Sequence, residues 1–201
     1  MRYAALLALL TIVAACSTPS TVSPLAIPLK YKTMATVAEF PTLPGCAAVS
    51  KVTVDDARDE KNLGKRYVEG KTGSNAVAPV TAANDVAPWV QEGVEATLKR
   101  SGVTIGNGNA PVLKITVDLI NTGENVLHRS GYEGRVQLSA DLQSASGASC
   151  WKGSADGSSE NYGYAGSIEN YQETLNHALD RAVIKMLSTP EVRKSICSCG
   201  G

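Results

Sequence analysis

Residues 113–119 read Leu-Lys-Ile-Thr-Val-Asp-Leu, and this stretch decides the fold class. Apolar and polar side chains alternate at every position, which is the pattern of a β-strand with one buried side and one side facing solvent. Two more strands are expected after it, at residues 134–142 and 150–160. A turn-forming segment at 144–147 separates these two, so the three strands are predicted to form an antiparallel meander.

Two amphipathic helices flank this meander. Before it, Asp85 is a suitable N-cap, Pro88 lies in the first turn, and Gly102 follows the last turn of a segment with apolar residues at helical spacing. After it, the apolar residues between Ile168 and Met186 form one continuous stripe along a second, longer helix. Each helix therefore has one face to bury against the strands.

A short strand at residues 52–54 opens the domain, and the polar stretch 55–84 follows it. That stretch is long for a loop, so we expect it to contain a short hairpin around 66–68. Apart from this insert, the element order is β-α-β-β-β-α. It predicts an α+β fold with a mainly antiparallel sheet of about four strands and two main helices packed on one face.

The N-terminus carries an export signal. Arg2 precedes an apolar run that is too short to span a bilayer, and the run ends in Val-Ala-Ala-Cys at 13–16. This ending resembles the bacterial lipobox, in which the signal peptide, here 1–15, is removed and the cysteine is lipidated. We therefore predict that a lipid on Cys16 is the membrane attachment; the alternative is an ordinary signal peptide with a chance cysteine.

The residue after the lipidated cysteine directs sorting in such lipoproteins, and an aspartate there retains the protein at the inner membrane. Ser17 occupies this position, so we expect the periplasmic face of the outer membrane. Residues 16–45 are rich in proline, serine and threonine and are predicted to be a flexible tether, although alternating apolar residues at 25–31 leave open that part of it lies along the domain. Residues 46–201 then form a single periplasmic domain.

The charge balance excludes one class of partner. Lysine and arginine together number 19, and aspartate and glutamate also number 19. Nucleic-acid binding requires a concentrated basic surface, so no nucleic-acid partner is expected.

Four features together resemble the YajG-like family of bacterial lipoproteins. They are Cys16, the strand motif at 52–58 followed by Leu63-Gly64, the segment WVQEGVEATLKRSGVTI at 89–105, and the strand LKITVDL at 113–119. The resemblance covers about 46–190. It implies an envelope lipoprotein to which no enzymatic activity and no catalytic residues can be assigned.

Motifs for catalysis, metals and cofactors are missing from the sequence. The only histidines are His128 and His177, and there is no GxSxG or HExxH motif. The acidic run at 55–61 lacks the spacing of a calcium loop, so a solvated turn with an internal Asp–Arg pair is favoured. We therefore expect no catalytic residue, metal or cofactor.

Three functional interpretations remain. The first is a non-catalytic module in envelope maintenance that binds a periplasmic protein, glycan or lipid. The second is an auxiliary lipoprotein of a lipid-transport or outer-membrane assembly machine, and the third is an enzyme without recognisable motifs.

The remaining cysteines should form disulfides, because export places them in an oxidising compartment. A right-handed crossover and the meander put Cys46, Cys150, Cys197 and Cys199 at one end of the domain. A bridge between Cys197 and Cys199 would be strained. The C-terminal tail is therefore expected to be joined to Cys46, to Cys150 or to both.

The same chain trace gathers three loops at the opposite end, and binding sites are common on such loops. The predicted tether leaves the domain at the end that carries the cysteines. This rim would therefore face away from the membrane, toward a partner. The alternative is that the loops are simply exposed to solvent. The candidate rim residues are Asp55, Asp56, Arg58, Asn121, Glu124, His128, Arg129, Tyr162 and Tyr164.

Overall fold

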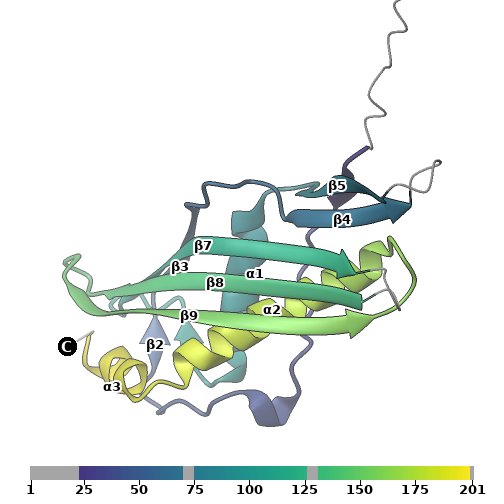
Figure 1. Ribbon diagram of the computed structural model, residues 1–201. Helices are drawn as coiled ribbons and strands as arrows, with labels where there is room; N and C mark the ends of the chain where they lie inside the picture. Colours follow the sequence, from purple (N-terminus) through teal and green to yellow (C-terminus); the bar gives the residue numbers. More distant parts are fainter. Residues whose placement is uncertain (1–22, 70–74, 126–130, 200–201) are drawn as a thin grey trace, which may run out of the picture.

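The computed structural model describes residues 23–69, 75–125 and 131–199, and Figure 1 shows the arrangement of their elements. The elements are β1 (Leu25–Ile27), a 3-10 helix η1 (Val37–Glu39), β2 (Ala48–Val49), β3 (Lys51–Asp56), β4 (Gly64–Glu69), β5 (Asn75–Ala82), α1 (Val86–Arg100), β6 (Thr104–Ile105), β7 (Val112–Asn125), β8 (Gly131–Gln143), β9 (Ser149–Tyr162), α2 (Ile168–Leu187) and α3 (Pro190–Ser198).

The main sheet has seven strands, in the order β1-β5-β4-β7-β8-β9, with β3 also paired to β7. The α+β class is confirmed, but the expected sheet of about four mainly antiparallel strands and its order are wrong. The β1, β4 and β5 strands come from segments that the sequence assigned to a tether and a polar insert. Pairing of β1 with β5, β3 with β7 and β4 with β7 is parallel, so the sheet is mixed.

The helices α1 and α2 cover one face of this sheet, behind the strands in Figure 1. Alternate residues of β7 and β8, including Ile115, Val117 and Leu138, are fully buried beneath them. Gly157 on β9 lets α2 approach closely, because a Cβ there would lie 2.1 Å from the carbonyl oxygen of Ala178. The other face of β7, β8 and β9 carries polar side chains and has no helix over it.

A β-bulge interrupts β7, and on the side away from β8 two different strands pair with β7, one before the bulge and one after it. The register shifts between Val117 and Leu119, so that Leu119 faces the open side and Ile120 is buried. The β3 strand pairs with β7 before the bulge, and β4 pairs with it after the bulge. At the start of β4, Gly64 has a φ of 153°, and a Cβ there would lie only 1.7 Å from the carbonyl oxygen of Thr122.

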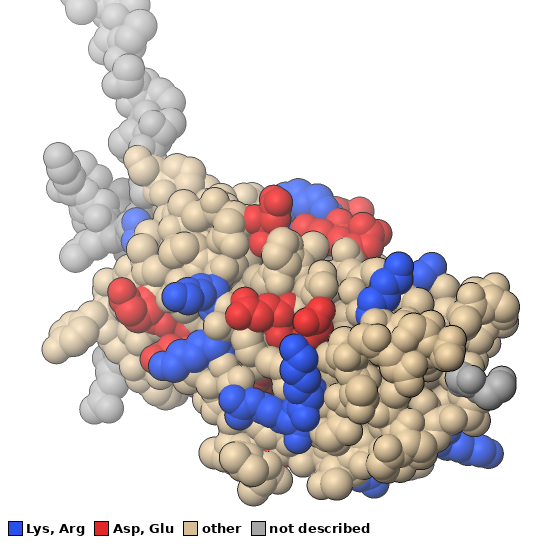
Figure 2. Space-filling model, turned by 180° about the vertical axis from the view of Figure 1, so that it is seen from behind, with Lys and Arg blue, Asp and Glu red and all other residues tan. Residues whose placement is uncertain are grey.

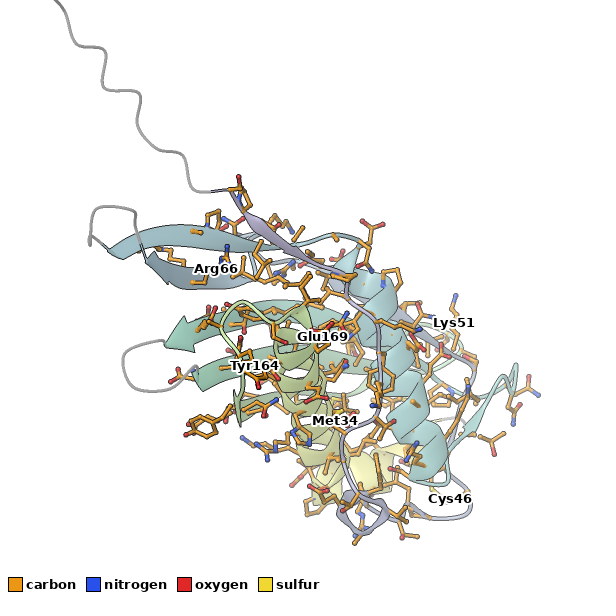
Figure 3. The ribbon with its side chains drawn as sticks, turned by 90° about the vertical axis from the view of Figure 1, so that its right-hand side faces the viewer. Met34, Cys46, Lys51, Arg66, Tyr164 and Glu169 are labelled. Atoms are coloured by element: carbon orange, nitrogen blue, oxygen red, sulfur yellow. A yellow bond between two sulfur atoms is a disulfide. The ribbon has the colours of Figure 1, made fainter. Side chains whose placement is uncertain are left out.

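Residues 28–45 form a strap that crosses the helix layer; Figure 3 shows it in front of the helices, near Met34. Ile27 and Leu43, at its two ends, are buried in the core. Asn84 accepts a hydrogen bond from the backbone N–H of Leu29 at 2.6 Å. The prediction of a tether over 16–45 is therefore corrected: residues 25–45 belong to the domain, as the alternation at 25–31 left open. Side chains of Asn84 and, on α2, of Asn176 and Asp180 hydrogen-bond their backbone, and the core buries their apolar side chains.

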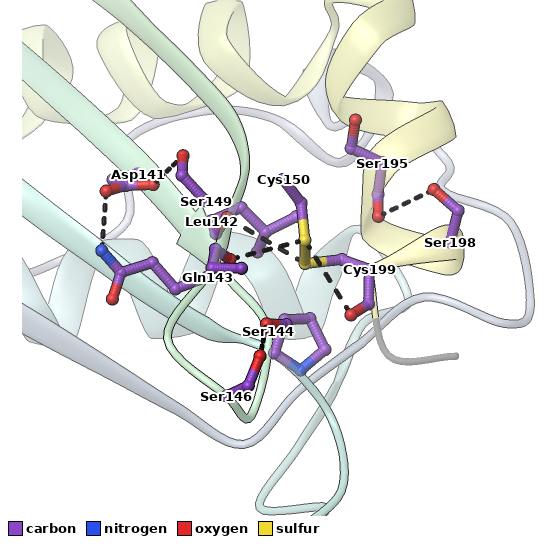
Figure 4. The surroundings of a disulfide bond; sticks show 12 residues. Asp141, Leu142, Gln143, Ser144, Ser146, Ser149, Cys150, Ser195, Ser198 and Cys199 are labelled. Atoms are coloured by element: carbon purple, nitrogen blue, oxygen red, sulfur yellow. Dashed lines mark hydrogen bonds between the residues drawn. A yellow bond between two sulfur atoms is a disulfide. The ribbon is translucent and has the colours of Figure 1, made fainter.

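Two disulfides close the far end of the domain. Cys46 is bonded to Cys197, and Cys150 is bonded to Cys199. Both bridges join the C-terminal tail to the expected partners; the second lies beside the β8–β9 turn (Figure 4). The expected exit of the tether at this end is wrong, because β1 pairs with β5 near the opposite end (Figure 1).

Among the described residues, no helix has the length and apolar character needed to cross a membrane.

Candidate functional site

A groove of about 1210 Å³ lies across the open face of the sheet. Strands β7, β8 and β9 form its floor, β4 and β5 form one wall, and the loop at 58–62 closes one side. Its polar lining side chains alternate along the strands with residues that face the helices, so the same pattern that builds the core also builds the groove. These lining side chains include Lys65, Asp118, Asn121, Glu133, Arg135, Ser158 and Glu160.

Side chains of both charge signs line the groove. Asp118 accepts a hydrogen bond from Ser139 at 2.6 Å, and Arg135 lies 3.9 Å from Asp156. Arg181 of α2 reaches the β9 edge and donates to the carbonyl oxygen of Ser158 at 2.5 Å. No aromatic side chain is found in its lining among the described residues. The groove therefore suits a polar ligand that itself presents both signs of charge.

The opposite, helix-covered side also carries interspersed acidic and basic side chains (Figure 2). Charge alone does not single out one face of the molecule. The groove is distinguished by its concave shape, which surrounds a ligand on more than one side.

Arg58 fixes the loop beside the groove. It is 5% exposed, and its Nε and Nη2 donate to the two carboxylate oxygens of Asp56 at 2.7 and 2.9 Å. These hydrogen bonds, despite partial burial, lower the pKa of Asp56 below its usual value. The expected Asp–Arg pair is present, but Arg58 is buried rather than solvated. Its Nη1 is also buried, with no hydrogen-bond partner in the part of the chain that the structure describes.

Glu124 is the centre of a buried cluster under the start of α2. It is 3% exposed and accepts hydrogen bonds from the Tyr171 hydroxyl at 3.1 Å and the Gly166 N–H at 2.8 Å, and the Tyr132 hydroxyl oxygen lies 3.3 Å from its Oε1. Burial is the main cause of a raised pKa at both Tyr132 and Tyr171, and the nearby Glu124 carboxylate adds to it. Glu124 thus holds the loop before α2 and is not an exposed binding residue.

The sequence model of a family described as "uncharacterized lipoprotein" matches residues 46–196, which include the groove and both helices over the sheet. The chain belongs to this lipoprotein family. The more specific resemblance to YajG-like proteins stays a prediction. No curated protein matches the sequence.

Several solved structures resemble this lipoprotein at low sequence identity. A protein from Xanthomonas campestris is 11% identical, with a TM-score of 0.49, and the alignment covers 87% of this chain and 98% of that one. The PelC dodecamer from Paraburkholderia phytofirmans is 16% identical, with a TM-score of 0.40 and coverage of 74% and 91%. A minor lipoprotein from Acinetobacter baumannii is 11% identical, with a TM-score of 0.38 and coverage of 74% and 91%.

The structure does not gather the predicted rim residues of the lipoprotein into one surface. Asp56 lies opposite Val117, half-way along β7, whereas Tyr162 lies opposite Gly131 at the sheet end, where β7 reaches Asn125. At strand rise these two levels are about 26 Å apart. The reason is that β3 ends at the bulge and β4 continues the pairing. Asp55 is exposed beside Asp56.

The structure places the remaining predicted rim residues in different surroundings. Asn121 is exposed and lines the groove, and Tyr162 and Tyr164 are exposed at the sheet end. His128 and Arg129 lie outside the described residues. His177 of α2 has its Nε2 3.2 Å from the carbonyl oxygen of Met34 on the strap.

The groove residues that the sequence reasoning missed are Glu133, Arg135 and Glu160. They occupy the polar positions of strands that were correctly placed, so their common face could have been predicted. The concave shape could not, because it depends on β4 and β5.

Proposed function

We propose that this lipoprotein is anchored to the outer membrane through a lipid on Cys16, and that its domain is a non-catalytic module binding an extended segment of another periplasmic protein along the open-face groove. The lining is the observation that carries the proposal. Acidic Glu133 and Glu160 stand beside basic Lys65 and Arg135 on a rigid sheet. Such a pattern recognises a partner through complementary charges, which give specificity and register more than raw affinity.

The other ligand classes fit this lining less well. Acyl chains require continuous apolar walls, whereas charged side chains on β4, β8 and β9 interrupt the apolar Val77, Pro79 and Leu119 of the lining, and this argues against an auxiliary role in lipid transport at this site. Glycan rings commonly stack on aromatic side chains, and none lines the groove among the described residues.

The binding proposal is tested by photo-crosslinking in intact envelopes. A crosslinking residue at Ser158, which is exposed in the groove, should capture a defined partner. Combined Glu133→Lys and Arg135→Glu reversal should reduce that product at least about tenfold, the effect of roughly 1.4 kcal/mol. Lys194→Glu, an exposed change on α3, is the matched control and should leave the product unchanged.

Circular dichroism must show that each variant folds. If the folded groove double variant keeps the full crosslink, the groove is not the binding site.

The anchor is tested separately with Cys16→Ala. This change should release the protein from outer membranes, because the lipid is the proposed attachment. Retention of the variant with salt-washed membranes would refute the anchor.

A further inference from the structure

The described chain enters the domain at one end of the sheet. Its first strand, β1, runs parallel to β5, with Leu25 opposite Val80. Continuing this register backward brings residue 23 level with Ala78, next to Val77. This is the end toward which β4, β7 and β9 run, and it is opposite the two disulfides (Figure 1).

The distance from this entry point to the anchor is limited by covalent geometry. Six residues, 17–22, separate Cys16 from Ser23, which makes seven Cα-to-Cα steps. A chain of that length spans at most about 25 Å when fully extended. A lipid on Cys16 therefore keeps this end of the domain within one small-domain diameter of the bilayer surface.

Exposed apolar side chains lie at the same end, on β5 near one edge of the sheet and at the end of β9 at the other edge. Val77, Tyr162 and Tyr164 are 51%, 68% and 91% exposed, and we call the end that carries them the tyrosine end. Figure 3 shows Tyr164 there, in the loop between β9 and α2. Among the described residues, the one other large hydrophobic side chain with comparable exposure is Val37, at 85%, which lies in η1 on the strap.

The loop that carries Tyr164 is held in place. The Tyr132 hydroxyl donates to the carbonyl oxygen of Tyr164, and Glu124 accepts a hydrogen bond from the Gly166 N–H at 2.8 Å. The backbone at 164–166 is thus tied to the buried cluster, while the Tyr164 ring extends into solvent. Exposing a large ring on a fixed loop favours contact with a surface, because little backbone freedom is lost when contact forms.

We propose that the tyrosine end rests on the bilayer that holds the Cys16 lipid, with Tyr162 and Tyr164 at headgroup level. Tyrosine suits this position because its ring is apolar and its hydroxyl is polar, and it is enriched at membrane interfaces. The inference rests on the proposed lipid anchor, since the short connection supplies the high local concentration that makes such a weak contact form.

This orientation reverses the expectation that the rim faces away from the membrane. The strands of β7, β8 and β9 then rise from the membrane, and the groove opens to the side. A partner segment can reach the groove without displacing the membrane contact.

The test uses the mature, lipidated full chain in vesicles of phosphatidylethanolamine and phosphatidylglycerol, with or without bromine atoms near the carbonyl end of the acyl chains. Tyr162→Trp and Tyr164→Trp keep an amphipathic ring and place a fluorophore at the tyrosine end. Val37→Trp is the matched control at an equally exposed position on the strap. The natural Trp89 and Trp151 are present in all three proteins and provide a common background.

We expect bromine to quench the fluorescence of the two tyrosine-end variants several-fold more than that of the Val37→Trp protein. Flotation of the vesicles reports the anchor independently. If the protein floats with the vesicles but all three variants are quenched equally or not at all, the membrane contact is refuted and the anchor stands. If the protein does not float, both the anchor and the contact are refuted.

A second variant tests the role of the short connection. Inserting a twenty-residue Gly-Ser segment directly after Ser17 should reduce the quenching of Tyr164→Trp while flotation is kept, because a longer linker lowers the effective concentration. Undiminished quenching would show that the contact does not depend on the connection, which contradicts the mechanism proposed here.

Discussion

The Tyr31 hydroxyl donates a hydrogen bond of 2.7 Å to Oδ1 of Asp180, which joins the strap to the middle of α2 across 149 positions of sequence. The other oxygen of this fully buried carboxylate accepts the N–H groups of Met34 and Ala35 at 2.7 and 2.9 Å. One acidic side chain thus supplies three acceptor contacts to the strap. A buried carboxylate is stable only with such partners, so strap and helix depend on each other.

Asp180→Ala should therefore lower the free energy of unfolding by about 2–4 kcal/mol, because two backbone N–H groups and one hydroxyl lose a charged acceptor. Chemical denaturation followed by circular dichroism measures this change. Asp59→Ala, at an exposed position, is the control and should change stability by less than about 0.5 kcal/mol. A similar, small effect of both variants would mean that the strap is held mainly by its apolar side chains.

Burial raises the pKa of Tyr31 from 10.0 to about 12, and Asp180 adds to the increase. The neutral hydroxyl is the form that the fold stabilises. Its contribution is therefore fully present below pH 10 and is lost as pH rises through about 12. We expect Tyr31→Phe to be less stable at neutral pH but to lose less stability than the wild type over this alkaline interval.

Denaturation at a series of alkaline pH values measures the slope for the two proteins. Part of the slope should persist in the variant, because the pKa values of Tyr132 and Tyr171 are also raised. Identical slopes would show that Tyr31 ionises as freely in the folded protein as in the unfolded chain.

Gly157→Ala should destabilise the packing of α2 on β9. The added Cβ would lie 2.1 Å from the carbonyl oxygen of Ala178 and 2.4 Å from the N of Ala182, and neither backbone atom can rotate away. We expect a loss of at least about 2 kcal/mol from this overpacking. Gly108→Ala meets nothing within 4 Å and should be close to neutral in the same thermal unfolding experiment.

Removing the two disulfides one at a time should show how much each contributes to the free energy of unfolding. Cys46–Cys197 spans 151 positions and Cys150–Cys199 spans 49. Because each bridge restricts the unfolded chain, replacing either pair by serine should cost about 2–4 kcal/mol, with the larger loss for the longer loop. Urea denaturation of the two double variants shows which one loses more stability. A larger loss for the Cys150–Cys199 pair would indicate that contacts in the native state, rather than loop length, determine the size of the effect.

The parts of the fold that follow local periodicity could be predicted from the sequence. The strands at β7, β8 and β9 and the helices α1 and α2 each carry a clear alternation or stripe, because one side of each is buried. The bulge could not be predicted, since Leu119 continues the alternation of Leu113, Ile115 and Val117 although its side chain faces the groove. An inserted residue in one strand is decided by pairing with distant segments.

The strands β4 and β5 form the hairpin expected around 66–68, and β1 falls where apolar residues alternate at 25–31, but their place in the main sheet could not be predicted. Their sequences are short, polar or rich in proline, and they form strands because β7 and the helix layer provide partners. The candidate site was missed with them: one wall of the groove is built from β4 and β5, so its shape depends on tertiary pairing. The location of the four disulfide cysteines at one end of the domain, in contrast, could be predicted. It depends only on the handedness of one crossover and the direction of the strands in the meander.

The bond between Cys46 and Cys197 also determines how the domain responds to a pulling force. Tension from the proposed lipid at Cys16 would reach the described chain at residue 23 and could peel β1 from β5 and the strap from the helices. Peeling stops at Cys46, because beyond it the chain is a covalently closed ring that includes the groove. The released segment, 23–45, extends by at most about 80 Å. The proposed anchor would therefore lengthen under load by releasing the strap, while Cys46 stays covalently joined to the C-terminal tail.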